Sequence, residues 1–148
     1  MNDILQRKAD HIDLVLEQRE HIRGLSNGFD GVILSHNALP EANLADLDLS
    51  CEFLGRKLAL PFLISSMTGG PRRAEAINTH LAEAAQELGI ALGVGSQRVA
   101  LLAKGSLGLT SQIRKIAPDI PLYANLGAAQ LRDDFSIADI RRAIDMIE

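Results

Sequence analysis

The chain has 148 residues, 47% of them hydrophobic, which suits one domain with a buried core. Its formal net charge of -4 excludes a general electrostatic attraction to nucleic acid or to an anionic membrane, so any anion must be bound locally. The single cysteine, Cys51, excludes an internal disulfide and a thiol-rich metal site and fits a reducing, cytoplasmic compartment. No uninterrupted apolar run reaches about 18 residues, so we expect neither a signal peptide nor a membrane span.

The N-terminal part is predicted to contain a helix, a long loop and a hairpin. Residues 4–20 carry apolar side chains at roughly helical spacing among charged ones, which predicts an amphipathic helix. Residues 26–48 contain Asn-Gly, Asp-Gly and a proline with little periodicity, so they predict a connecting loop of a length that is often functional. Residues 49–60 predict a small hairpin around Leu54 and Gly55.

The rest of the chain alternates between strand and helix patterns. Apolar runs at 61–64, 90–94 and 122–126 predict strands. Helices are predicted at 71–88, where Gly89 would end the helix, at 109–117, and after Ser136, an N-cap with Asp139 near the helix start. Such alternation favours parallel βα units with right-handed crossovers. Polar residues follow each strand, at the sheet edge where α/β proteins bind ligands.

The clearest ligand-binding motif is residues 93–98, which read Gly-Val-Gly-Ser-Gln-Arg. It begins like a dinucleotide fingerprint, but Arg98 occupies the place of the third glycine, which makes a Rossmann interpretation weak. A tight turn remains, in which backbone N–H groups and the side chains of Ser96, Gln97 and Arg98 could donate to phosphate oxygens. The pattern leaves a phosphate site and an ordinary turn equally open.

Three further segments carry candidate residues, each with a plain structural alternative. Arg7, Lys8 and His11 stand at i, i+1 and i+4 and could converge on one anion, although such a face is usually only solvated. Residues 65–70, Ser-Ser-Met-Thr-Gly-Gly, would let a planar ring or phosphate approach the backbone, or would form an ordinary βα turn. Asn125 could bond a heteroaromatic ring or satisfy loop backbone groups.

Four segments together, at 7–12, 34–41, 61–70 and 93–98, resemble type 2 isopentenyl diphosphate isomerase in sequence, order and spacing. This resemblance extends over essentially the whole chain and implies an α/β fold of the TIM (β/α)8 barrel family. Residues 1–60 would form an N-terminal helix, loop and hairpin, and residues 61–148 the first three βα units. Because such barrels normally need about 250 residues, we expect an incomplete barrel and a truncated chain that is inactive alone.

The resemblance also implies an isomerase of isoprenoid biosynthesis that converts isopentenyl to dimethylallyl diphosphate. Reduced FMN would be its acid/base cofactor through flavin N5, so no catalytic residue is assigned in this flavoprotein. NAD(P)H would reduce the flavin, and Mg²⁺ would bind the diphosphate through ligands outside this chain. We expect a small-molecule diphosphate partner and a homo-oligomer in full-length members, without nucleic acid or membrane. The implied FMN contacts are Ser66, Met67, Thr68, Ser96 and Asn125. The implied diphosphate contacts are Arg7, Lys8, His11, Ser96, Gln97 and Arg98.

Two alternatives remain open at this stage. One is another FMN-dependent barrel enzyme, such as a hydroxy-acid oxidase, against which the Ser-Gln-Arg turn at 96–98 argues. The other is a non-enzymatic α/β domain of open, flavodoxin-like topology that binds a phosphate at its strand ends.

Overall fold

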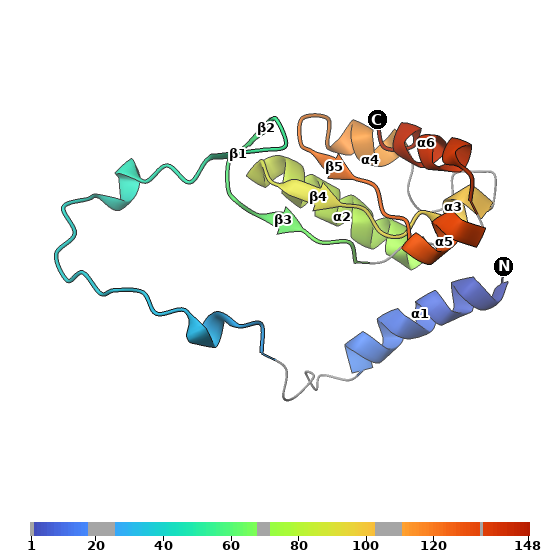
Figure 1. Cartoon of the computed structure of the whole chain (residues 1–148), viewed down its shortest axis with the longest axis horizontal. Helices are drawn as coiled ribbons and strands as arrows, with labels where there is room; N and C mark the ends of the chain where they lie inside the picture. Colours follow the sequence, from blue (N-terminus) through green and yellow to red (C-terminus); the bar gives the residue numbers. More distant parts are fainter. Residues whose placement is uncertain (1, 18–25, 68–71, 103–110, 134) are drawn as a thin grey trace.

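The computed structural model describes residues 2–17, 26–67, 72–102, 111–133 and 135–148. The chain begins with helix α1 (Asn2–Glu17). Residues 26–50 form an extended segment that contains two single 3-10 turns, η1 (Phe29–Gly31) and η2 (Leu44–Asp46). Figure 1 shows this segment as a wide loop that runs outside the rest of the molecule before it joins the first strand. All residues from 26 to 49 are exposed, including the large apolar side chains of Ile33 and Leu34.

Strands β1 (Cys51–Phe53) and β2 (Arg56–Leu58) form the predicted antiparallel hairpin. Both residues of its turn have left-handed backbone, with φ of 49° at Leu54 and 73° at Gly55. This is the conformation that two-residue hairpin turns require, because it matches the twist of the flanking strands. Beyond the hairpin, the Ala59 N–H donates to the Gly89 carbonyl at 2.9 Å and so attaches this segment to the end of the next helix.

The central sheet has three parallel strands in the order β3 (Leu63–Ile64), β4 (Ala91–Gly93) and β5 (Leu122–Tyr123). Leu63 pairs with Ala91, and Leu92 with Leu122, so each strand lies beside the next one along the chain. The sheet therefore has two open edges within the described residues, one at β3 and one at β5.

Helices α2 (Arg72–Leu88), α4 (Ser111–Ile116) and α6 (Ile137–Asp145) accompany the sheet, with the short helices α3 (Arg98–Leu102) and α5 (Ala128–Asp133) near the strand ends. One face of β4 packs against helices, because Leu92 belongs to one buried cluster with residues of α2 and α4. The buried cluster consists of Ala82, Ala85, Ile90, Leu92, Val94, Ile113, Ala117, Ile120 and Ile147. On the other face the Phe53 ring of the hairpin meets Tyr123 edge to face, at 6.2 Å between centroids.

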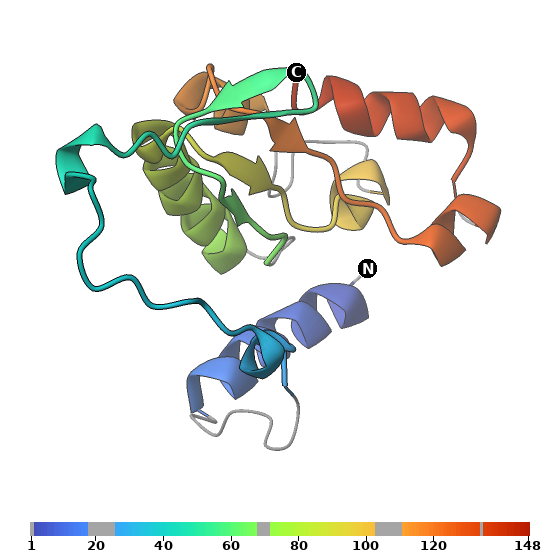
Figure 2. The same cartoon turned by 60° about the vertical axis from the view of Figure 1, so that its left-hand side comes forward.

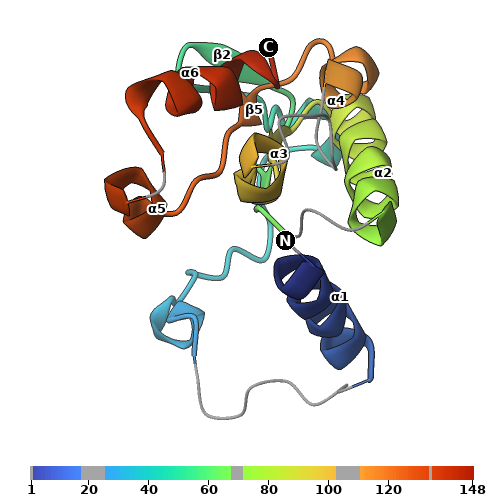
Figure 3. The same ribbon diagram turned by 90° about the vertical axis from the view of Figure 1, so that its right-hand side faces the viewer.

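Helix α1 lies away from α4 and α6 and is joined to α2 by the side chains of Asp13 and Arg73. Figures 1 and 3 show α4 and α6 on one side of the sheet and α1 on the opposite side. In Figure 2 the extended segment runs from the side of α1 back to the hairpin. In the described part of the chain, no helix combines the length and apolarity needed to cross a membrane.

The element boundaries correct several sequence-based expectations. All three strands are shorter than predicted, at Leu63–Ile64, Ala91–Gly93 and Leu122–Tyr123. The first helix begins earlier than predicted, at Asn2, and the last residues of its predicted range, 18–20, lie outside the described residues. The expected fold class also changes: the described residues form an open sheet of three strands with a separate hairpin, so the TIM-barrel designation is corrected to a small open α/β sheet. The division of the chain at residue 60 stays a prediction.

Candidate functional site

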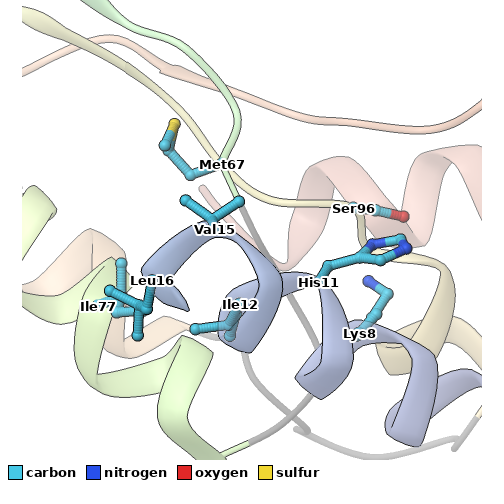
Figure 4. A pocket seen from close by; sticks show the side chains of 8 residues that line it. All are labelled: Lys8, His11, Ile12, Val15, Leu16, Met67, Ile77 and Ser96. Atoms are coloured by element: carbon cyan, nitrogen blue, oxygen red, sulfur yellow. The ribbon is translucent and has the colours of Figure 1, made fainter. Parts of the chain in front are cut away.

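A pocket of about 350 Å³ lies between α1 and the carboxyl ends of β3 and β4. Ser96 and Met67, which line it, follow those two strands, and the other lining residues come from α1 and α2 (Figure 4). The size is within the range of small-molecule sites, roughly 300–1,000 Å³. The lining residues are Lys8, His11, Ile12, Val15, Leu16, Met67, Ile77 and Ser96.

One end of the pocket is polar and cationic. Figure 4 shows the Lys8 and His11 side chains extending from α1 toward Ser96. Partial burial lowers the pKa of Lys8, and the positive charges of Arg7 and Arg98 lower this pKa further. Arg7 and Arg98 are therefore close enough to Lys8 to repel its charge, and a bound anion would relieve the repulsion of all three cations.

The other end of the pocket is apolar. Ile12, Val15 and Leu16 stand at i, i+3 and i+4 on α1 and face Ile77 of α2 and Met67 (Figure 4). Val15 and Met67 are largely exposed, at 76% and 68%. Because nothing in the described residues covers them, an apolar ligand group placed here would gain burial.

An ion pair between exposed side chains joins α1 to α2. The Arg73 guanidinium donates to the Asp13 carboxylate at 2.6 Å, and both side chains are about half exposed. Asp13 lies one position from Ile12 of the pocket, so the pair acts on the part of α1 that lines the site.

The strand ends approach each other closely at Gly93. A Cβ atom at this position would lie 3.0 Å from the Ser66 hydroxyl and 3.2 Å from its backbone nitrogen. Glycine therefore lets the chain leaving β3 lie against β4. Ser66 packs here and is not among the residues that line the pocket.

Gln97 is fully buried, and its amide bonds to the protein on both sides. Its Nε2 donates to the Ala143 carbonyl of α6 at 2.6 Å, and its Oε1 accepts from the Asn125 N–H at 3.1 Å. Its own N–H donates to the Asn125 carbonyl at 3.1 Å. These bonds favour a positioning role for Gln97, and its predicted contact with a diphosphate stays a prediction.

The structure thus brings together residues far apart in sequence: Lys8 and His11 of α1 meet Ser96, with Arg7 and Arg98 nearby and Met67 at the apolar end. Ser66 and Asn125 lie beside the turn without lining the pocket, and Thr68 lies outside the described residues. Sequence reasoning missed Ile77 as a pocket residue. The apolar spacing of Ile12, Val15 and Leu16 predicts one face of a helix, and the same spacing is the signal that indicates an apolar pocket wall.

The fold and the site define an α/β protein whose ligand pocket, cationic at one end and apolar at the other, lies at the carboxyl ends of parallel strands. No protein-family model matches the chain. It is, however, similar to curated bacterial proteins that share one name.

The chain is 53% identical over 145 residues to the isopentenyl-diphosphate delta-isomerase of Stutzerimonas stutzeri, covering 98% of the chain and 42% of the relative. It is 58% identical over 142 residues to the isopentenyl-diphosphate delta-isomerase of Xanthobacter autotrophicus, covering 96% and 41%. The relative of the same name from Synechocystis is 48% identical over 148 residues, covering 100% and 42%. The chain therefore spans about 42% of the length of the curated relatives it matches.

These similarities correct the narrower family expectation. The relatives are named for the isomerase alone, with neither a type 2 designation nor a flavin in the name, and the described chain has no closed barrel. The resemblance is therefore corrected to isopentenyl-diphosphate delta-isomerase without the type 2, flavoprotein and TIM-barrel designations. The expected cofactors FMN and NAD(P)H are withdrawn with them, whereas Mg²⁺ stays a prediction. The binding role predicted for Ser66, Met67, Thr68, Ser96 and Asn125 is not tested and also stays a prediction.

Proposed function

We propose that this chain has the function of an isopentenyl-diphosphate delta-isomerase, and that its pocket binds the diphosphate and the five-carbon group of isopentenyl diphosphate. The proposal is supported by the names of the relatives, at about half identity over nearly the whole chain. It places the protein in isoprenoid biosynthesis, in the cytoplasm, with a small-molecule diphosphate as its partner.

One observation carries the proposal: the pocket has two chemically different ends that match the two ends of this substrate. The diphosphate is compact and multiply charged, so it needs several converging donors. Lys8, His11 and Ser96 line the cationic end, and Arg7 and Arg98 act on Lys8 through their charges. The branched hydrocarbon needs apolar walls, which the other end supplies.

The proposed roles follow from these positions. Lys8, with Arg7 and Arg98, neutralises the diphosphate, while Ser96 and His11 donate hydrogen bonds to its oxygens. The apolar residues of α1 hold the alkene by burial. Isomerisation moves the double bond by adding a proton at one carbon and removing one from another. Holding both ends of the substrate would keep the reacting carbons in one place for these transfers.

Calorimetric titration with three ligands tests this proposal: isopentenyl diphosphate, inorganic pyrophosphate and the corresponding alcohol, 3-methyl-3-buten-1-ol. We expect the diphosphate ester to bind most tightly, pyrophosphate less tightly and the alcohol not measurably. Lys8→Met should lower the affinity for both anions by roughly tenfold or more. Lys115→Met is the matched control, because it removes the same charge from an exposed lysine of α4.

The apolar end has its own test. Val15→Ala should lower the affinity for isopentenyl diphosphate and leave the affinity for pyrophosphate unchanged. Val32→Ala, in the exposed segment, should change neither affinity. Equal affinity for isopentenyl diphosphate and pyrophosphate would contradict the substrate assignment and support a simple phosphate-binding domain. Isomerisation itself is followed by proton NMR, through the loss of the terminal vinylidene protons of isopentenyl diphosphate.

A further inference from the structure

We propose that Gln97 is a positioning residue, whose buried side-chain amide couples the anion-binding turn to helix α6 and to the end of strand β5. The inference rests on the proposed function, because it assumes that the turn at residues 96–98 binds the diphosphate. It differs from the sequence-based prediction, in which Gln97 contacts the diphosphate directly.

The amide is placed where both of its functional groups are needed. Ala143 lies in the last turn of α6, where helix carbonyls have no intrahelical partner, and Gln97 donates to that carbonyl at 2.6 Å. The other end of the same amide accepts from the Asn125 N–H, beyond β5, at 3.1 Å. Since the side chain is wholly buried, losing either bond would leave a buried polar group unsatisfied.

The neighbours of Gln97 in sequence are the residues that face the proposed anion. Ser96 lines the pocket, and Arg98 acts on Lys8 through its charge. The Gln97 backbone N–H is itself bonded to the Asn125 carbonyl at 3.1 Å. Two hydrogen bonds to Asn125 and one to Ala143 therefore fix the position of Gln97. Because Ser96 and Arg98 are its neighbours in the chain, the same bonds orient these two residues.

The decisive variant is Gln97→Glu, which has the same shape and becomes a donor only when protonated. A neutral carboxylic acid can donate to the Ala143 carbonyl and accept from the Asn125 N–H, whereas a carboxylate can only accept. Burial raises the pKa of such an acid, so its protonation is varied by changing the pH over the range in which the protein stays folded. We measure the pyrophosphate affinity of the variant relative to the unaltered protein at each pH, under conditions where near-ultraviolet circular dichroism shows both folded.

We expect this ratio to approach one at the acid end and to fall by roughly tenfold at the alkaline end. Arg142→Gln is the matched control, since Arg142 also ties α6 to α3, by donating to the Leu101 carbonyl at 3.0 Å, three positions beyond the turn at residues 96–98. Its ratio should not vary with pH. A folded Gln97→Glu protein with an unchanged ratio at every pH would overturn the inference.

A second measurement uses the unaltered protein and so does not depend on how the variant folds. Pyrophosphate should slow hydrogen exchange at the Asn125 N–H, which bonds to Gln97, more than at the nearby Gly127 N–H, which bonds to Gln130. Equal slowing at both amides would also overturn the inference. Absence of pyrophosphate binding by the unaltered protein would instead contradict the proposed function, so the two failures are distinguishable.

Discussion

Arg73 of α2 donates a hydrogen bond to Asp13 of α1 at 2.6 Å, across 60 positions of sequence. Both side chains are about half exposed, and ion pairs in that setting contribute only about 0–1 kcal/mol to stability. The pair nevertheless joins the helix that carries Lys8 and His11 to the helix that carries Ile77, three of the residues around the pocket.

We predict that Arg73→Gln lowers the free energy of unfolding by less than about 1 kcal/mol and weakens pyrophosphate binding severalfold, because α1 is held less firmly. A double-mutant cycle with Asp13→Asn in urea titrations, together with calorimetry at low and high salt, measures both effects. The effects should shrink at high salt. Arg141→Gln removes an exposed arginine of α6 and serves as the charge control; an equal loss of affinity in that variant would contradict a specific role for the pair.

Lys8 makes the pH dependence of anion binding predictable. Burial and the charges of Arg7 and Arg98 lower its pKa in the folded protein, so Lys8 loses its charge at a lower pH than an exposed lysine does. In the absence of anion, the unfolded chain binds more protons between the two pKa values, and stability should therefore rise with pH in that window.

Pyrophosphate affinity should change in the opposite direction, falling as pH rises through the lowered pKa of Lys8. Lys8→Arg provides the comparison, because a guanidinium stays charged over this range while the ligand titrates identically in both experiments. The ratio of the two affinities, measured by calorimetry across alkaline pH, should shift steadily in favour of the variant. A constant ratio would show that Lys8 does not carry the charge that binds the anion.

The hairpin turn contains one residue whose backbone conformation is unfavourable for its side chain. Leu54 has φ of 49° and is 74% exposed, so it occupies left-handed backbone with little burial in return. We predict that Leu54→Asn raises the free energy of unfolding by about 0.5–1 kcal/mol, because asparagine tolerates this conformation better. Urea denaturation measures the change. Leu54→Val, which is β-branched, should lower stability, and a gain of similar size from both substitutions would rule out the backbone explanation.

The sequence predicted the elements whose signals are local. Turn residues at Leu54 and Gly55 predicted the hairpin, Gly89 the end of α2, and Ser136 the start of α6, and each is confirmed. The short helices α3 and α5 were not predicted, because five or six residues show little of a helical period, although α4, which is equally short, was predicted within the range 109–117.

The candidate site was predictable only in part, for a similar reason. Arg7, Lys8 and Arg98 are cationic in any fold, so the sequence alone marks them as candidates for binding an anion. Their assignment to one site came from the resemblance to a known family. Gln97 shows the limit of such reasoning: its amide could donate to a phosphate or to a carbonyl, and only the packing of α6, which begins 40 residues later, decides which of these it reaches. Ile77 likewise joins the pocket through the packing of two helices.

Gly89 combines a backbone constraint with a steric one. It has φ of +62°, and an added Cβ would lie 2.9 Å from the Cβ of Ala59. We predict that Gly89→Ala lowers the free energy of unfolding by about 1–3 kcal/mol, measured by urea denaturation. Gly55→Ala is the control, since Gly55 also has positive φ, at +73°, but open space around it. A smaller loss at Gly55 is expected, and equal losses would mean that contact with Ala59 costs nothing.

The N-terminus of α6 is capped by side chains of its own first turn, and this helix carries the carbonyl that Gln97 binds. Ser136 and Asp139 form a capping box: the Asp139 carboxylate accepts from the Ser136 N–H at 2.9 Å and from its hydroxyl at 2.7 Å. These two bonds, with a smaller contribution from the Arg142 charge, hold the pKa of Asp139 below its ordinary value. Ser136→Ala should therefore lower the free energy of unfolding by about 1 kcal/mol at neutral pH.

The sign of the pH dependence follows from the direction of that shift. A carboxyl whose folded pKa is depressed stabilises the protein above its unfolded pKa, and this stabilisation is lost as the pH falls through the folded pKa. The cost of Ser136→Ala should thus be largest near neutral pH and shrink in acid, where Asp139 is protonated in both proteins. Thermal melts from neutral to acid pH measure this. Ser50→Ala is a positive control outside α6, because Ser50, through its backbone N–H and its side chain, also lowers the pKa of a carboxyl, that of Asp48, and loss of the side chain should therefore show a pH dependence of the same sign. If Ser136→Ala costs the same at every pH, the carboxylate of Asp139 does not contribute to the cap.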